Sequence, residues 1–217
     1  MSWTFNWAEG AHAAQPSYNQ FSYNGCAVGC GAVAWGILFG WADSQAASGN
    51  PFWRDRWGLY RVNGGRGGNA VAPLAMDEGV RNMIREIRDH IATFCLTGSG
   101  ATFPWDMGQA DRYLSGRTGT SLDTHYNSFG IHENRLRNYA RSSIIDRKTP
   151  VIIGTGWLSH YPVAYGYAWQ NRVVRRCILF CWNENVTDRS FYVNQGWGGA
   201  LNGWITASTW FAGEIFP

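Results

Sequence analysis

Charge is the property that this sequence has least of. Only 15% of its 217 residues are charged, whereas 45% are hydrophobic, which excludes a disordered chain and a coiled coil. The net charge is +3, and no cluster of basic residues exceeds the pair Arg175-Arg176. The sequence therefore offers no basic track for nucleic acid. A chain of this length buries roughly 70% of its unfolded surface, so a substantial core is expected.

Long apolar runs are also missing. The longest, Ala32–Trp41, contains two glycines and is too short to cross a bilayer, so we expect no membrane-spanning segment. Residues 1–9 have neither the basic region nor the apolar core of a signal peptide. We therefore expect either a protein that stays inside the cell or a mature piece without its export signal.

Cysteine is sparse, and its number, five, is odd, which disfavours a small disulfide-stabilised scaffold. Cys26/Cys30 and Cys177/Cys181 are two pairs whose thiolates could together bind zinc. Three residues separate the members of each pair, whereas zinc knuckles usually have about two. Because Cys177 and Cys181 also flank an apolar run, we expect no zinc site.

Aromatic residues and glycines are abundant: aromatic residues make up 16% of the chain, and there are 27 glycines. This favours a mixed or β-rich fold. Apolar spacing and capping residues predict helices at 30–47, 77–91, 104–114 and 133–143, with irregular chain at 1–29 and a loop at 48–72. Strands are predicted at 151–153, 162–169, 173–182, 190–194 and 204–210. Helices followed by an antiparallel sheet define an α+β fold.

Cys30 stands where a glycine-flanked loop becomes a buried helix. The free N–H groups and positive dipole of a first helical turn stabilise a thiolate, which is the nucleophilic form of cysteine. The alternative is an inert, buried cysteine that fills space. Cys26, the rival nucleophile, precedes no sustained helix, so we expect it to be structural or a redox neighbour of Cys30.

Two further segments can supply partners for a nucleophile. His160 opens a predicted strand, and Asn194 ends another strand before a turn rich in Gly and Trp. An Asn can accept a hydrogen bond from a histidine ring and fix its tautomer. Each residue also has a purely structural interpretation. The rival bases are His12, His90, His125 and His132.

The order Cys30, His160, Asn194 is the layout of papain-like cysteine proteases. The segment 29–34 resembles the nucleophile helix of the streptopain-like cysteine peptidases. His160 with its strand is similar to that family's catalytic histidine strand, and Tyr192–Gly199 resembles its closing motif. The resemblance implies one papain-like catalytic domain over 1–217. Its helical lobe would span about 1–148 and its β-rich lobe about 149–217.

The resemblance also implies a cysteine peptidase that cleaves peptide bonds through an acyl-enzyme, a reaction that needs no metal or organic cofactor. Cys30 would attack as a thiolate, His160 would be the imidazolium of a resting ion pair, and Asn194 would orient the ring. Gln15, with Gln20 as its competitor, would complete the oxyanion hole. A polypeptide would be the substrate, a prosegment or protein inhibitor the further partner, and secretion the family's usual localisation.

The sequence departs from the family pattern at two positions. Gln195 stands where the family usually has Trp after the Asn, and Gly31 stands where it usually has a small residue other than glycine. Both departures leave the Cys and His in place but leave substrate preference open. An amidase or acyl-transferase on the same scaffold, and a non-catalytic papain-like binding module, remain alternatives.

Overall fold

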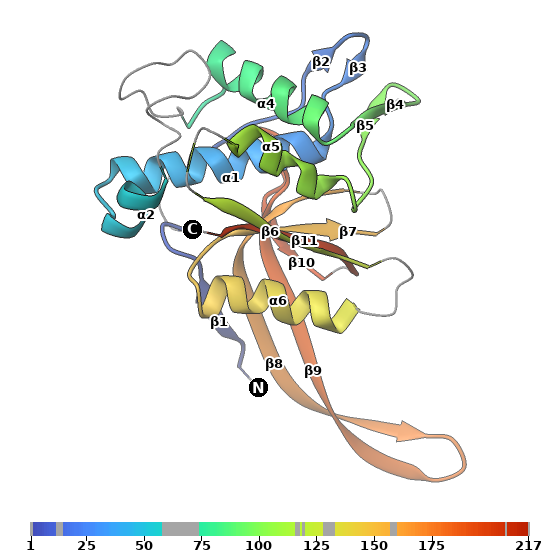
Figure 1. Ribbon diagram of the computed structural model, residues 1–217. Helices are drawn as coiled ribbons and strands as arrows, with labels where there is room; N and C mark the ends of the chain where they lie inside the picture. Colours follow the sequence, from blue (N-terminus) through green and yellow to red (C-terminus); the bar gives the residue numbers. More distant parts are fainter. Residues whose placement is uncertain are drawn as a thin grey trace.

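The computed structural model places helices on both sides of a twisted antiparallel sheet (Figure 1). The helices α1, α2, α4 and α5 lie on one side, and α6 lies on the other. The structure describes residues 2–11, 15–57, 74–115, 118, 120–127, 133–156, 160–206 and 208–216, with the side chain of residue 56 left out. The mixed helix and antiparallel sheet architecture is the α+β class predicted from the sequence.

The main sheet has seven strands in the order β10-β9-β8-β7-β11-β6, and β1 pairs with β8 beside this path. All its pairings are antiparallel. The strands are β1 Thr4–Trp7, β6 Ser121–Tyr126, β7 Val151–Thr155, β8 Val163–Cys177, β9 Cys181–Asn194, β10 Gly203–Ile205 and β11 Thr209–Phe216. Two small hairpins, β2 Ser22–Tyr23 with β3 Cys26–Ala27 and β4 Phe94–Leu96 with β5 Ser99–Ala101, complete the strands of the described residues.

Alternating side chains send the sheet's apolar residues to two separate cores. Ile152 and Val163 pack with α1, whereas their neighbours Val151 and Ala164 pack with α6. This follows from the two-residue period of a strand, because successive side chains point to opposite faces. The sheet is therefore covered on both faces, and the α1 face contains the larger core.

The helix α1, Cys30–Ala47, is buried on almost every side, as its nearly continuous apolar sequence requires. Its one buried charge, Asp43, accepts a hydrogen bond of 2.7 Å from the Trp57 indole N–H. A close approach lies about one turn before Asp43: a Cβ at Gly40 would clash with the Tyr18 hydroxyl oxygen. Glycine at position 40 thus lets the N-terminal segment pack directly on the helix.

A buried carboxylate joins α6, Glu133–Ile145, to the sheet. Glu214 of β11 is 1% exposed, and its oxygens lie 2.6 Å from Arg147 Nε, 2.7 Å from the Thr149 hydroxyl and 2.8 Å from the Tyr139 hydroxyl. Each of these contacts supplies a donor to the charge, as a buried carboxylate needs.

Several helix predictions are confirmed. The helix α1 has the predicted bounds, and α4 spans Glu78–His90 with Asp77 as its cap, accepting from the Val80 N–H at 2.7 Å. The predicted apolar stripe of α4 is buried, from Val80 to Ile91. The helix predicted at 133–143 is α6.

Other local predictions are wrong. The segment 104–114 forms a 3₁₀ turn, η1 Met107–Ala110, and a short helix, α5 Asp111–Leu114. The expected loop at 48–72 contains α2 Pro51–Arg56, started by the Asn50 cap and Pro51, while 58–72 lies outside the described residues. The strand predicted at 173–182 contains the turn between β8 and β9.

The sheet is not confined to the last third of the chain, as the sequence predicted. The strand β1 comes from the segment expected to be irregular, and β6 lies between the helices α5 and α6. Both join the sheet through pairing with distant strands, which local sequence patterns do not show. The division into lobes near residue 148 stays a prediction.

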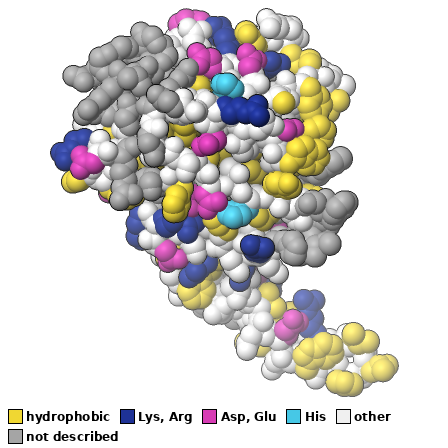
Figure 2. All heavy atoms as spheres, in the orientation of Figure 1, with side chains coloured by type: hydrophobic (Ala, Val, Ile, Leu, Met, Phe, Trp, Pro, Cys, Tyr) yellow, Lys and Arg dark blue, Asp and Glu magenta, His cyan; other side chains and the backbone are white. Residues whose placement is uncertain are grey.

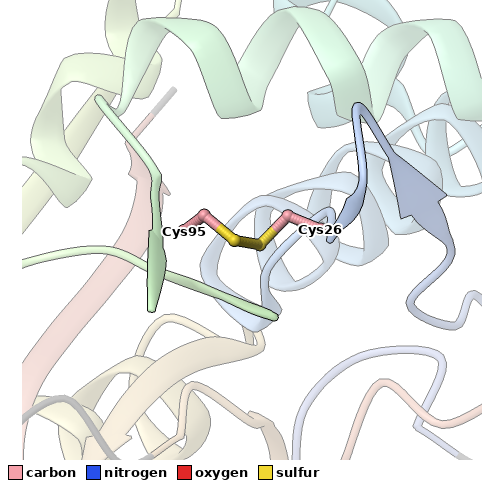
Figure 3. Close-up of a disulfide and its surroundings, with 2 residues drawn as sticks. All are labelled: Cys26 and Cys95. Atoms are coloured by element: carbon pink, nitrogen blue, oxygen red, sulfur yellow. A yellow bond between two sulfur atoms is a disulfide. The ribbon is translucent and has the colours of Figure 1, made fainter. Parts of the chain in front are cut away.

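Four of the five cysteines form disulfides, contrary to the expectation from their low number. Cys26 pairs with Cys95 and ties β3 to β4 (Figure 3), and Cys177 pairs with Cys181. Cys26 is therefore structural, as predicted. Among the described residues, no helix is long and apolar enough to cross a membrane.

The two disulfides should differ in their contribution to stability. In the chain-entropy account, a crosslink between residues 69 apart restricts the unfolded chain more than one between residues 4 apart. We expect the double variant Cys26→Ser/Cys95→Ser to lose about 4 kcal/mol in free energy of unfolding, and Cys177→Ser/Cys181→Ser about 2 kcal/mol. Urea unfolding measures both, and equal losses would contradict this account.

Candidate active site

Cys30 is the first residue of α1 and the free cysteine of the chain. Gly29, just before it, has φ of +100°, a backbone conformation that favours glycine. A Cβ at Gly29 would also lie 3.2 Å from the Gly100 carbonyl oxygen. The turn that delivers Cys30 to the helix start therefore needs glycine at position 29.

The sulfur of Cys30 lies against backbone donors from two parts of the chain. Tyr161, Cys30 and Gly31 each give it a backbone hydrogen bond that lowers the thiol pKa. Burial acts in the opposite direction and is the larger effect, so the pKa of Cys30 is raised above its ordinary value of 9.0. The contact with Tyr161 brings the chain at His160 to the sulfur, across 130 positions of sequence (160 − 30).

The ring of His160 is held by the residue that follows β9. Its Nε2 lies 2.9 Å from the Gln195 carbonyl oxygen. A carbonyl only accepts, so Nε2 carries the proton and Nδ1 has the free lone pair in the neutral ring. The His160 backbone is fixed separately, because its carbonyl accepts from the Thr155 N–H at 2.8 Å.

Trp197 lies nearly parallel to the His160 ring, with centroids 6.0 Å apart and planes inclined by 22°. It covers one face of the imidazole while remaining 45% exposed itself. Trp197 pairs in turn with Asn19 in an isolated β-bridge. The N-terminal segment therefore supports the wall of the site.

Burial also lowers the pKa of His160 below its ordinary value of 6.5, although the hydrogen bonds to Gln195 oppose this. A raised thiol pKa and a lowered imidazole pKa both favour the uncharged forms, a Cys30 thiol and a neutral His160 ring, which together are called the neutral pair below. This differs from the resting thiolate–imidazolium pair expected from the family resemblance. The physical reason is desolvation, which outweighs the backbone donors around the sulfur.

Asn194 does not supply the hydrogen bond that the sequence assigned to it. Its Nδ2 donates to the Pro16 carbonyl at 3.0 Å, and its Oδ1 accepts from the Gly196 N–H at 3.0 Å. The His160 ring instead contacts the backbone carbonyl of Gln195, the residue that follows Asn194. Asn194 is buried, and its Oδ1 closes the turn that carries Gln195.

Gln15, the residue expected in the oxyanion hole, lines the same cavity as Asn194, and its hydrogen bond is not to the Cys30 sulfur. Its Nε2 donates to the Ala11 carbonyl at 2.9 Å. It lines a cavity of about 440 Å³ whose described lining includes Trp7, Tyr192 and Asn194, but neither Cys30 nor His160.

Gln20 lies on a different stretch of the same segment. Its neighbour Asn19 bridges to Trp197, and the carbonyl of Phe21 accepts from the Val28 N–H at 2.9 Å, two residues before Cys30. Position 20 therefore lies on the stretch of backbone that links Trp197, which covers the His160 ring, to the start of α1.

The rival residues are placed elsewhere. Cys26 is in a disulfide, and His125 lies 3.2 Å from Asp123 and packs on Tyr139. His90 ends α4, and His12 and His132 lie outside the described residues. Among the described side chains, no group of three or more His, Cys, Asp or Glu is arranged to hold a metal ion.

Sequence reasoning missed the contributions that come from backbone atoms. The Tyr161 N–H and the Gln195 carbonyl depend on chain position rather than on side-chain type, so no residue pattern identifies them. The sequence pointed to Gln195 only because it replaces the usual Trp of the family motif, and it gave no sign of the carbonyl contact with His160.

No family model matches the chain, and no curated protein matches it. Among solved structures, a fragment of prointerpain A from Prevotella intermedia, in a Cys-to-Ala mutant form, is similar with a TM-score of 0.52 and 11% identity. The match covers 97% of this chain and 71% of that one. Prointerpain A is a papain-like cysteine peptidase precursor. At this identity the likeness shows a distant relationship of fold.

The neutral pair predicts how the thiol responds to pH. Because burial raises the pKa of the Cys30 thiol above its ordinary value, we expect its alkylation by iodoacetamide to be slow near neutral pH and to rise only in alkaline solution. Mass spectrometry of the Cys30 peptide measures this rate. Fast alkylation already at pH 5–6, lost in His160→Gln, would instead show a thiolate–imidazolium pair.

Proposed function

We propose that this protein is a cysteine peptidase whose nucleophile is Cys30 and whose general base is His160. The observation that carries the proposal is the contact between the Tyr161 backbone and the Cys30 sulfur. It joins the one unpaired cysteine to the residue next to His160. The distant likeness in fold to a peptidase precursor supports the same class.

In the first half of the reaction, the scissile carbonyl of a polypeptide lies beside the Cys30 thiol. His160 Nδ1 takes the thiol proton as the sulfur bonds to the carbonyl carbon. The C=O bond becomes a tetrahedral oxyanion. His160 then gives its proton to the amine nitrogen, the C–N bond breaks, and a thioester of Cys30 remains.

In the second half, water replaces the amine. His160 Nδ1 takes a proton from the water as its oxygen attacks the thioester carbonyl, and the C–S bond breaks on collapse. The sulfur recovers the proton, and the acid product leaves. Throughout the cycle, the Gln195 carbonyl accepts from Nε2–H and stabilises the imidazolium that forms transiently.

For the oxyanion we propose the Cys30 backbone N–H and a glutamine side chain. Gln20 is the better candidate, because its stretch of chain lies between the Trp197 wall and the start of α1. The amide of Gln15, which the sequence favoured, already donates to Ala11. Asn194 is a positioning residue that fixes the turn bearing the Gln195 carbonyl.

We further propose a polypeptide substrate and a protein partner of the prosegment or inhibitor type, with the helical part and the sheet forming the two sides of the substrate cleft. Disulfides persist in oxidising compartments, so the two found here favour secretion.

The dyad is tested with a peptidyl chloromethyl ketone and an unfolded protein substrate. We expect Cys30→Ala and His160→Ala each to lower peptide cleavage on the order of 10³-fold or more. The control variant His90→Ala, at the C-terminal end of α4, should cleave like the wild type. The label should map to Cys30. Release of ammonia without chain cleavage would show an amidase, and reaction of neither kind would favour the binding module.

The two glutamines provide a matched pair of variants. We expect Gln20→Ala to lower kcat by roughly 100- to 1,000-fold while Cys30 still alkylates normally, because an oxyanion donor acts in the transition state. Gln15→Ala should change kcat by less than about tenfold. The reverse ranking would return the oxyanion role to Gln15.

A further inference from the structure

The outer half of the β8–β9 hairpin extends beyond the body of the protein (Figure 1). The two strands pair from Val163 and Asn194 at the base to Cys177 and Cys181 at the tip. Their residues are mainly buried near the base and mainly exposed from about position 171 outward. This outer ribbon is thus two strands in solvent on both faces.

The tip of this ribbon is apolar and almost fully exposed. Ile178, Leu179 and Phe180 have exposed fractions of 85%, 94% and 74%. Figure 2 shows the hydrophobic side chains gathered at the far end of the hairpin. Three consecutive apolar residues exposed in this way contribute nothing to the core, and such a run indicates contact with another surface.

A disulfide closes the tip. Cys177 and Cys181 flank the three apolar residues and are themselves paired across the strands. The loop is therefore held in one shape before it meets a partner, which lowers the entropy lost on binding.

A collar of one aromatic and two basic residues follows the tip. Trp182 lies opposite Arg176 in the strand pairing, and its ring centroid is 6.0 Å from that of Phe180. Arg176 pairs with Glu184 at 3.0 Å, while Arg175 has no ion pair within the described part of the chain. Further from the tip the ribbon is mixed: Val173 is 55% exposed, and Arg172 pairs with Asp188 at 2.6 Å.

We propose that the tip, residues 178–180, inserts into the surface of a membrane containing anionic lipids. From tip to base, the apolar residues come first, Trp182 and Arg176 follow at one level, and Arg175 lies one residue further. This matches the order of acyl chains, interface and phosphates in a bilayer. A lipid surface accepts a convex apolar tip without a preformed pocket. Arg175 would meet the lipid phosphates.

The same two strands connect this tip to the site. The strand β8 begins three residues after His160, and β9 ends at Asn194, next to Gln195. Fourteen steps along β8 (177 − 163) correspond to roughly 45 Å. Insertion of the tip would therefore hold Cys30 and His160 away from the lipid surface, where a polypeptide can reach them.

The test is sedimentation of the full chain with vesicles of phosphatidylcholine alone or with about 30% phosphatidylglycerol. We expect binding to the anionic vesicles, and at least a tenfold lower partition coefficient for Leu179→Asp. Arg175→Gln should bind about fivefold less tightly to anionic vesicles only. The matched control is Leu201→Asp, because Leu201 is also highly exposed, at 79%, but lies outside the hairpin. It should bind like the wild type.

An unchanged thermal midpoint and unchanged Cys30 alkylation will show that the variants are folded, and neither readout depends on peptidase activity. The proposal is overturned if the wild type ignores both vesicles, or if Leu179→Asp binds as well as Leu201→Asp. A concentration-dependent dimer that Leu179→Asp dissociates, without lipid binding, would assign the tip to a second copy of the chain instead.

Discussion

The site depends on one backbone contact, the hydrogen bond from Tyr161 to the sulfur of Cys30. It joins the start of a buried helix to the chain that leads into β8. Two features keep these parts in place: α1 packs in the same core as Val163 and Tyr165, and the Tyr161 hydroxyl donates to the Thr102 carbonyl at 2.9 Å. The stability of the fold and the geometry of the site are therefore set by the same packing.

Burial gives this pair its chemical character. The helix start and three backbone donors favour a thiolate, but desolvation is stronger and raises the thiol pKa, while it lowers that of the imidazole. A neutral pair needs His160 to act first as a base. The Gln195 carbonyl fixes the required tautomer without adding a charge.

The sequence predicted the parts of this structure that are determined locally. The helix α1, the Asp77-capped helix α4 and the position of Cys30 follow from apolar spacing, caps and glycines. It did not predict β1 and β6, whose strands form only through long-range pairing, or the turn that divides β8 from β9. The sequence also did not predict that four of the five cysteines form two disulfides, since the fold decides which cysteines lie close together.

For the candidate site, the order of residues along the chain predicted which segments lie near each other better than it predicted what each side chain contacts. The Tyr161 backbone, next to His160, lies against the Cys30 sulfur although 131 positions separate them (161 − 30), whereas the pairing of Cys30 with His160 itself stays a prediction. The roles expected for Asn194 and Gln15 rested on the family resemblance, yet the side-chain amide of each donates to a backbone carbonyl. The ring of His160 contacts a backbone group, the Gln195 carbonyl, and no residue type in the sequence identifies such a contact.

The most direct test is a crystal structure that measures the distance from the Cys30 sulfur to His160 Nδ1. The account predicts about 3.5–4 Å, with Nε2 turned toward the Gln195 carbonyl. A sulfur more than about 6 Å from the ring, or a ring with Nδ1 turned away from the sulfur, would contradict it.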